Sequence, residues 1–131
     1  GGDEEMDLIS EYVRTVQKMG DMENDGLDSK KKAKQYNRSA DRLREIASEI
    51  NHDRSEEKPA FSHLLFHERA DIRIWAAHHI LEVMDYHGET RKYALKEISL
   101  VASCDESING LGNRMWLEQW LTAHPEDQSL L

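Results

Sequence analysis

The sequence predicts an all-α protein built as one domain over residues 1–131. Apolar residues recur three and four positions apart along almost the whole chain, which is the periodicity of amphipathic helices. β-branched residues are sparse, and no segment alternates strictly between polar and apolar residues as a half-buried strand does. A chain of 131 residues forms one hydrophobic core rather than two, so we expect about six helices around it.

Two long amphipathic helices are predicted in the first half of the chain. The first covers about residues 4–19 and ends at Gly20, and an acidic connection follows over residues 21–26. The second covers about residues 29–51. Each helix has one apolar stripe, formed by Leu8, Ile9, Tyr12, Val13, Val16 and Met19 in the first and by Ala33, Tyr36, Ala40, Leu43, Ile46, Ala47 and Ile50 in the second. We expect both helices to bury these stripes.

A short third helix and an unusually apolar fourth helix are predicted next. Ser55 is a suitable N-cap for the third helix, about residues 56–66, and Pro59 lies early enough in it to be tolerated. The fourth helix covers about residues 70–84 and is apolar nearly all round, with Ile72, Ile74, Trp75, Ala76, Ala77, Ile80, Leu81, Val83 and Met84. Such a helix has to be surrounded by other elements, so we place it at the centre of the domain.

Two further helices and a tail complete the predicted domain. Gly88 separates the fourth helix from a fifth, about residues 89–102, and a sixth helix covers about residues 111–123. Pro125 ends the sixth helix, and we expect the tail of residues 125–131 to be loose.

The junction between the third and fourth helices has a distinctive spacing over residues 64–77. Two leucines precede a four-residue turn, Ile72 returns the chain to the same core, and two consecutive alanines let the backbones approach closely. This run resembles the inter-helix turn of a HEAT-like repeat. The resemblance implies that Arg73 pairs with an acidic residue of the turn or of the next repeat, and that the ring of His67 hydrogen-bonds the backbone of the turn.

More narrowly, residues 8–101 resemble a small bacterial family of unknown function with a HEAT-like fold. The matching features are the segment Lys34–Arg38, the Leu-Leu-x-His turn and the aliphatic-Arg-x-x-Ala-Ala segment, whereas Glu68 and Ala70 replace turn prolines common in that family. The resemblance implies a right-handed superhelix of antiparallel helix pairs. It implies no particular activity, and an immunity role beside toxin genes is an analogy only.

The charge balance restricts the partners that the chain is expected to bind. The formal net charge is −9 at pH 7, and such a surface attracts basic proteins and repels nucleic acids and anionic membranes. No apolar run reaches the ~18 residues of a membrane helix, and residues 1–20 lack the basic start of a signal peptide. With Cys104 as the single cysteine, we expect a cytoplasmic protein without a membrane or nucleic-acid partner.

Two patterns suggest metal binding but fit it incompletely. Residues 21–26 carry acids at the first, third and fifth positions of a calcium loop, but Lys32 stands at the twelfth position, where glutamate is needed. His63 and His67 lie four residues apart and suit one face of a transition-metal site. Further histidines that could join them are His78, His79 and His87. Neither pattern supplies a full ligand set, so we favour a solvated acidic loop and turn or surface histidines, and we expect no cofactor.

No arrangement of residues indicates catalysis. Cys104 is followed by Asp105 and Glu106 rather than by the basic groups that activate a thiol. The segment Gly110–Gly112 lacks the Gly-Lys-Ser/Thr of a phosphate loop, and we expect it to open the last helix and allow tight packing. We therefore predict that the protein is not an enzyme.

The most polar stripe of the fourth helix is the best candidate for a binding surface. Its members fall at spacings of four, three, four and three, namely Asp71, Trp75, His78, Glu82 and Asp85. Three residues of the sixth helix could extend it, namely Arg114, Trp116 and Glu118. An aromatic residue among acids suits a basic protein partner, although large aromatics at helical spacing are more often packed in a core.

These observations favour a non-enzymatic protein–protein interaction domain with a basic protein as its partner. Its sharpest version is an immunity-type protein that binds and neutralises a basic toxin. Two alternatives stay open, namely a metal-binding or enzymatic helical protein that uses His63 and His67, and a purely homo-oligomeric structural protein.

Overall fold

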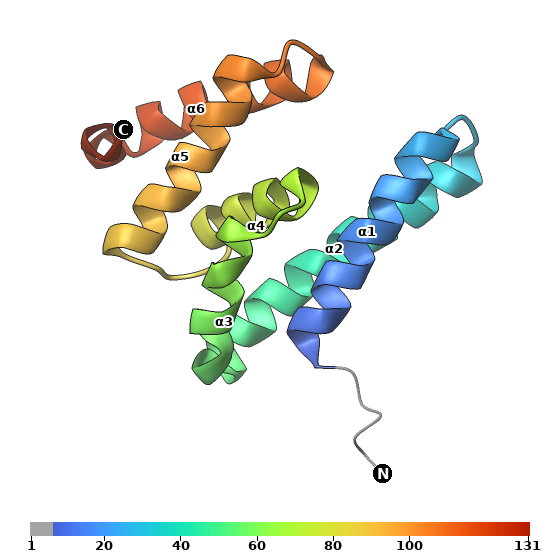
Figure 1. Cartoon of the computed structure of the whole chain (residues 1–131), viewed down its shortest axis with the longest axis horizontal. Coiled ribbons are helices and arrows are strands. Elements are labelled where there is room, and N and C mark those ends of the chain that lie inside the picture. The colour runs from blue at the N-terminus through green and yellow to red at the C-terminus, as the bar shows by residue number, and fades with distance from the viewer. Residues whose placement is uncertain (1–6) are drawn as a thin grey trace.

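The computed structural model describes residues 7–131, and these residues contain helices and no strand (Figure 1). The α-helices are α1 (Leu8–Asp25), α2 (Lys30–Asp53), α3 (Lys58–Ser62), α4 (Ala70–Glu82), α5 (Gly88–Cys104) and α6 (Ile108–Ala123). Short 3-10 helices cover Ser55–Glu57, His63–Phe66 and Pro125–Leu130. The all-α prediction is therefore confirmed for the described residues. None of these helices combines the length and the apolar character needed to cross a lipid bilayer.

Helix α1 continues past the residue where the sequence predicts its end. The Asp7 side chain caps its first turn by accepting a hydrogen bond from the Ser10 backbone N–H at 2.8 Å. Gly20 lies inside the helix, where a glycine costs only about 1 kcal/mol. A Cβ atom at Gly20 would lie 3.1 Å from Asp71 Oδ2, so the missing side chain allows α4 to approach. The helix ends at Gly26, whose φ of 95° strains other residue types.

The prediction that residues 21–26 form a connection between two helices is wrong. Residues 21–25 are the last part of α1, and their acidic side chains project from a helix rather than from a loop. A calcium loop curls its backbone around the ion, so this segment is not the first half of such a loop. The predicted beginning of the helix at residues 4–6 lies outside the described residues.

Helix α2 lies beside α1 and buries the predicted stripe in its C-terminal half (Figure 1). Leu43, Ile46, Ala47 and Ile50 are fully buried, whereas the N-terminal half of the stripe is only half-buried. A two-pronged ion pair joins the helices, because Arg42 Nε and Nη2 donate to the Glu11 carboxylate at 2.7 and 2.8 Å.

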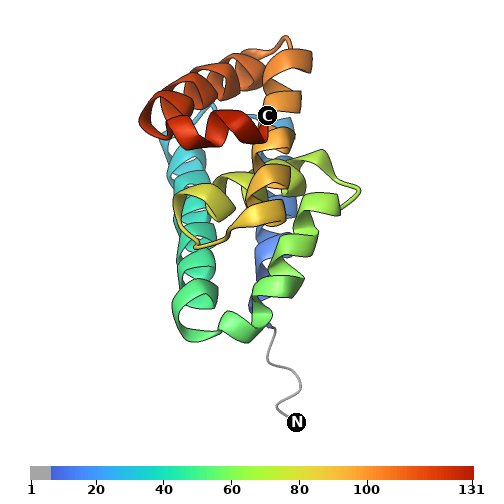
Figure 2. The same ribbon diagram turned by 90° about the vertical axis from the view of Figure 1, so that its left-hand side faces the viewer.

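The single helix predicted over residues 56–66 is divided into a 3-10 turn, the short α3 and a second 3-10 turn. A segment of this length gains little from helix formation alone, so tertiary packing decides its backbone. The predicted apolar face is correct, because Phe61, Leu64 and Leu65 are all buried. Figure 2 shows this segment at one end of the domain, opposite α6 and the C-terminal 3-10 helix.

Helix α4 occupies the centre of the domain, as its all-round apolar sequence predicts. It contacts α1, α2, α3 and α5, and Figure 1 shows it between the α1–α2 pair and the α5–α6 pair. Ala76 and Ala77 are fully buried at these contacts, which allows the neighbouring helices to approach closely. The helix ends at Glu82, two residues before its predicted end.

Helices α5 and α6 pack against each other through a tight junction. The Ser107 hydroxyl caps α6, which begins at Ile108, three residues before its predicted start. Gly110 is buried in the junction, and a Cβ atom there would lie 1.7 Å from the backbone oxygen of Asp105. This contact confirms that the glycine-containing segment opens the last helix and permits close packing.

The C-terminal tail differs from the expectation that it is loose. Pro125–Leu130 form a 3-10 helix, and the Asp127 side chain is only 2% exposed. Arg91 Nε and Nη2 donate to this carboxylate at 2.9 and 2.7 Å, and Trp120 Nε1 donates to it at 2.8 Å. Three charge-assisted hydrogen bonds hold the tail against α5 and α6. The sequence gives no sign of them, because Arg91 and Asp127 are 36 residues apart.

Candidate functional site

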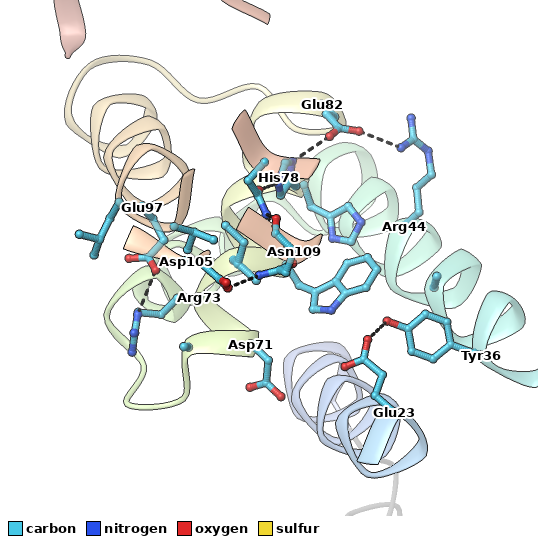
Figure 3. A pocket seen from close by; sticks show the side chains of 18 of the residues that line it. Glu23, Tyr36, Arg44, Asp71, Arg73, His78, Glu82, Glu97, Asp105 and Asn109 are labelled. Atoms are coloured by element: carbon cyan, nitrogen blue, oxygen red, sulfur yellow. Dashed lines mark hydrogen bonds and ion pairs between the residues drawn. The ribbon is translucent and has the colours of Figure 1, made fainter. Parts of the chain in front are cut away.

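A groove of about 860 Å³ crosses the domain over the central helix (Figure 3). Helix α4 forms its floor, α2 and the end of α1 form one wall, and α5 and the start of α6 form the other. Its volume lies in the range of binding pockets in proteins. The lining residues are Glu23, Tyr36, Ala40, Asp41, Arg44, Ala70, Asp71, Arg73, Ile74, Trp75, His78, His79, Glu82, Glu97, Leu100, Val101, Cys104, Asp105, Asn109 and Asn113.

An aromatic and several aliphatic side chains lie among the polar residues that line the groove. The half-buried Trp75 ring stacks on the His79 ring, with the centroids 5.8 Å apart. Ile74 is half-buried beside it on α4, and Leu100 on α5 is 54% exposed. An aromatic ring surrounded by aliphatic side chains gives a partner apolar area to cover.

His79 joins the groove to the core. Its Nδ1 atom lies 2.6 Å from the hydroxyl of Tyr12, which is completely buried. Burial lowers the pKa of His79 to about 4 and raises the pKa of the Tyr12 hydroxyl well above its usual value. The His79 ring is therefore neutral at pH 7, and sequence analysis considers it only as a metal ligand.

Glu82 is the centre of a hydrogen-bond network that crosses the groove (Figure 3). Its Oε2 atom accepts from Trp116 Nε1 at 2.9 Å and lies 3.1 Å from His78 Nδ1, and its Oε1 atom lies 3.7 Å from Arg44 Nη1. On the other side of its ring, His78 Nε2 lies 2.7 Å from Asn113 Oδ1. The hydrogen bond from His78 lowers the pKa of Glu82. The network ties α4 to both α2 and α6.

Two arginines near the start of α4, Arg69 and Arg73, hold the turn before it. Arg69 Nε and Nη2 donate to Asp71 at 3.0 and 2.8 Å, which lowers the pKa of that carboxyl. Arg73 Nη1 donates to the backbone oxygens of His67 and Glu68, and its Nε lies 3.3 Å from Glu97 Oε2 on α5. The HEAT-like resemblance implies an acidic partner for Arg73 in the turn or in the next repeat, and the acid that the structure places beside it is Glu97 on α5.

The ring of His67 also does what the resemblance implies. Its Nδ1 atom accepts a hydrogen bond from the Arg69 backbone N–H at 3.0 Å. His63, four residues earlier, is exposed. Among residues 7–131 there is no group of three or more His, Cys, Asp or Glu side chains placed to hold a metal ion.

The structure brings together four of the eight residues predicted to form the binding surface. Asp71, Trp75, His78 and Glu82 line the groove, and Trp116 touches its edge through the hydrogen bond to Glu82. Both tryptophans are half-buried and pack against the core as well. Trp75 and Trp116 therefore each bury part of the ring against the core and leave part of it exposed.

The other three predicted residues do not join this surface. Asp85 lies beyond the end of α4, where its backbone N–H donates to Asn51 Oδ1 and its backbone oxygen accepts from Lys58 Nζ. Arg114 Nη1 donates to the backbone oxygens of Ala102 and Asp105 in the α5–α6 junction. Glu118 is exposed on α6 and does not line the groove. Arg114 is held by backbone oxygens of the α5–α6 junction, and spacing within one helix does not display such a contact.

Sequence reasoning missed the wall formed by the first two helices. Tyr36, Asp41 and Arg44 on α2 and Glu23 near the end of α1 all line the groove. The Tyr36 hydroxyl donates to Glu23 Oε1 at 2.6 Å, so this pair fixes the rim (Figure 3). Tyr36 belongs to the segment Lys34–Arg38 that carries the family resemblance, and that was the available signal.

Residues 7–131 thus form an all-helical fold with a groove over its central helix α4. Comparison with protein families assigns residues 7–110 to a domain of unknown function, DUF2019. The chain therefore belongs to the DUF2019 family, whose model covers α1 through the start of α6. A search of curated proteins finds no match, and neither does a search of solved structures.

Proposed function

We propose that this chain is a non-enzymatic protein-binding domain and that the groove over α4 docks a basic protein. The observation that carries the proposal is the combination of an aromatic floor at Trp75 with carboxylates on the rim. Six acids line the groove; Asp71, Glu82 and Glu97 are paired with arginines, and the other three, Glu23, Asp41 and Asp105, form no ion pair among residues 7–131. An apolar centre with a charged rim is the usual anatomy of a protein interface.

We further propose that the domain is a right-handed superhelix of antiparallel HEAT-like helix pairs. Three helical units follow one another along the chain, and Arg73 bridges the turn before α4 to Glu97 on the next unit. Stacked helical repeats use one extended face for binding, which agrees with a groove between units. An experimental structure superposed on HEAT repeats would test the geometry, and a left-handed or bundle-like arrangement would refute it.

The sharpest version of the proposal is an immunity-type role, in which the domain neutralises a basic toxin inside a bacterial cytoplasm. The support for it is the net charge of −9 and the acidic rim of the groove. Purification of the native complex from the source cell tests this version. A basic toxin recovered with the chain supports it, and repeated recovery of the free chain contradicts it.

The general proposal is tested with synthetic helical peptides that share an apolar face and differ only in charge. We expect the basic peptide to bind at least about tenfold more tightly than the acidic one in calorimetric titration. Equal affinity, or no binding by any basic peptide or protein, would refute the proposal. A metal that copurifies in stoichiometric amounts and is lost in the His63→Ala and His67→Ala variants would support a metal protein, and light scattering would reveal a homo-oligomer.

A further inference from the structure

The floor of the groove contains a polar atom that the fold leaves without a partner. His79 is 5% exposed, and its Nε2 atom forms no hydrogen bond within residues 7–131. Among residues 7–131, Glu57 Oε2 is the one side-chain polar atom that is both inaccessible to solvent and without a hydrogen bond, so His79 Nε2 does not belong to this class. His79 Nε2 therefore keeps some accessible surface, and we infer that this surface faces the groove that His79 lines.

The hydrogen bond between Tyr12 and His79 determines whether His79 Nε2 carries a hydrogen atom. The Tyr12 hydroxyl is completely buried and His79 Nδ1 is its one hydrogen-bond partner among the described residues, so the hydroxyl donates and Nδ1 accepts. The reverse arrangement would leave the hydroxyl proton buried and unpaired. A neutral ring that accepts at Nδ1 carries its hydrogen at Nε2. The groove floor thus presents an N–H donor beside the Trp75 ring, and a partner has to bring the acceptor.

Three groove carboxylates form no ion pair among residues 7–131, and two of them, Glu23 and Asp41, lie on the α1–α2 rim, whereas the third is Asp105. On the α1–α2 side, Asp41 is exposed and forms no ion pair among residues 7–131, and Glu23 uses only Oε1 to accept from Tyr36. On the α5–α6 side, Glu97 is paired with Arg73. Asp105 on that side accepts hydrogen bonds from the Ser107 and Asn109 side chains. Cations of a partner are therefore attracted to the α1–α2 rim.

We propose that the groove seats an amphipathic helix of a basic partner protein, with its basic edge along the α1–α2 rim and one side-chain acceptor hydrogen-bonded to His79 Nε2. The apolar face of that helix covers Ile74, Trp75 and Leu100. The described part of the chain has no sheet edge to which an extended peptide could add, whereas helices commonly bind in helical grooves. This inference rests on the proposed function and specifies how the site recognises its partner.

The test uses the full chain and three synthetic helices of about 18 residues, long enough to hold helical structure. The first has leucines on one face, lysines along one edge and one glutamine within the leucine face. The second replaces that glutamine by leucine, which removes the acceptor. The third replaces the lysines by glutamates, which reverses the charge of the edge.

Nitrogen NMR reports where the first peptide binds. We expect it to shift the signals of His79 Nε2 and of the Trp75 indole N–H. The indole N–H of Trp120 is the internal reference, because it is bonded to Asp127 away from the groove. We expect this signal to stay in place.

Affinities then test the two contacts separately. The peptide without the glutamine is expected to bind about fivefold more weakly, as for one lost hydrogen bond. Asp41→Lys is expected to weaken the first peptide about tenfold by placing like charges together. Glu118→Lys makes the same charge change on an exposed residue outside the groove, and we expect it to leave the affinity unchanged.

The outcomes separate this inference from the proposed function. If basic peptides bind but the His79 and Trp75 signals stay in place, or Asp41→Lys has the effect of Glu118→Lys, the seating is wrong and protein binding stands. If the first two peptides bind with equal affinity, the proposed hydrogen bond from His79 Nε2 to the partner is wrong. If no basic peptide or protein binds, the proposed function fails with the inference. Circular dichroism of both variants shows that a weakened affinity is not a loss of folding.

Discussion

Acidification from pH 6.5 to pH 4 is expected to destabilise this protein through one buried histidine. Burial lowers the pKa of His79 from its ordinary value of 6.5 to about 4 in the folded chain. In this range the unfolded chain binds a proton at that position and the folded chain does not, so unfolding is favoured as the pH falls. The stabilisation is complete above pH 6.5, decreases between pH 6.5 and 4, and does not decrease further below pH 4.

The size of the effect follows from the difference between the two pKa values. A difference of one pKa unit corresponds to about 1.4 kcal/mol, so a shift from 6.5 to about 4 gives a total loss of about 3 kcal/mol. About 2 kcal/mol of this is lost by pH 5. A domain of this size is stable by roughly 5–15 kcal/mol, so the loss is measurable. The carboxyls with lowered pKa values, such as Asp71 and Asp127, contribute only at lower pH.

Urea unfolding followed by circular dichroism, at intervals between pH 7.5 and 4.5, measures this dependence. The double variant Tyr12→Phe/His79→Phe removes both members of the buried pair and leaves neither polar group unpaired. Between pH 7.5 and 5, we expect the free energy of unfolding of the double variant to decrease by about 2 kcal/mol less than that of wild type. His63→Gln, which removes an exposed histidine, is the matched control and should keep the wild-type dependence.

Two results would refute this reasoning. One is a wild-type free energy of unfolding that stays constant between pH 7.5 and 4.5. The other is a double variant whose pH dependence equals that of wild type, because the titrating group would then lie elsewhere.

Three substitutions test the packing of the C-terminal third of the chain. Gly110→Ala places a methyl group against the backbone oxygen of Asp105 and is expected to cost about 3 kcal/mol of stability. Gly112→Ala meets no atom within 4 Å and should stabilise the helix by about 1 kcal/mol. Asp127→Ala leaves the Arg91 guanidinium without its carboxylate and is expected to cost about 3 kcal/mol. Urea unfolding measures all three.

The glycine pair contains its own control, because both changes add one methyl group to the same helix. Equal effects of the two alanines would contradict the close contact at Gly110. For the tail, Glu126→Ala removes an exposed neighbouring carboxylate and should change stability by less than about 0.5 kcal/mol. If Asp127→Ala is as mild as Glu126→Ala, the tail is not held by its ion pair.

The position of α4 shows what local sequence patterns could predict. The segment from Ile72 to Leu81 is apolar nearly all round, so its central position follows from its composition, although one side of it forms the floor of the groove. The apolar stripes of α1 and α2 were found for the same reason, since a period of 3.6 residues is visible in any one helix. The resemblance to a HEAT-like turn led to the expectation that Arg73 pairs with an acid, which periodicity could not provide, and the structure places Glu97 Oε2 3.3 Å from Arg73 Nε.

Errors in the helix ends came from residues whose meaning depends on distant neighbours. Gly20 looks like a helix end but lies inside α1, where Asp71 approaches it. The tail looks loose but is held by Arg91, because a carboxylate and a guanidinium 36 residues apart meet in the fold. In both cases a local rule was overridden by contacts that the sequence does not display.

The sequence by itself determined the helical class, the central helix and the shared stripe of Asp71, Trp75, His78 and Glu82, because each depends on spacing within one helix. The tertiary structure alone decided the groove, since its walls depend on how α2 and α5 are placed beside α4. It also decided which polar groups stay free. Asp71 is paired with Arg69 and Glu82 with Arg44, whereas Asp41 and His79 Nε2 have no such partner among residues 7–131. Pairing between helices depends on their relative rotation and register.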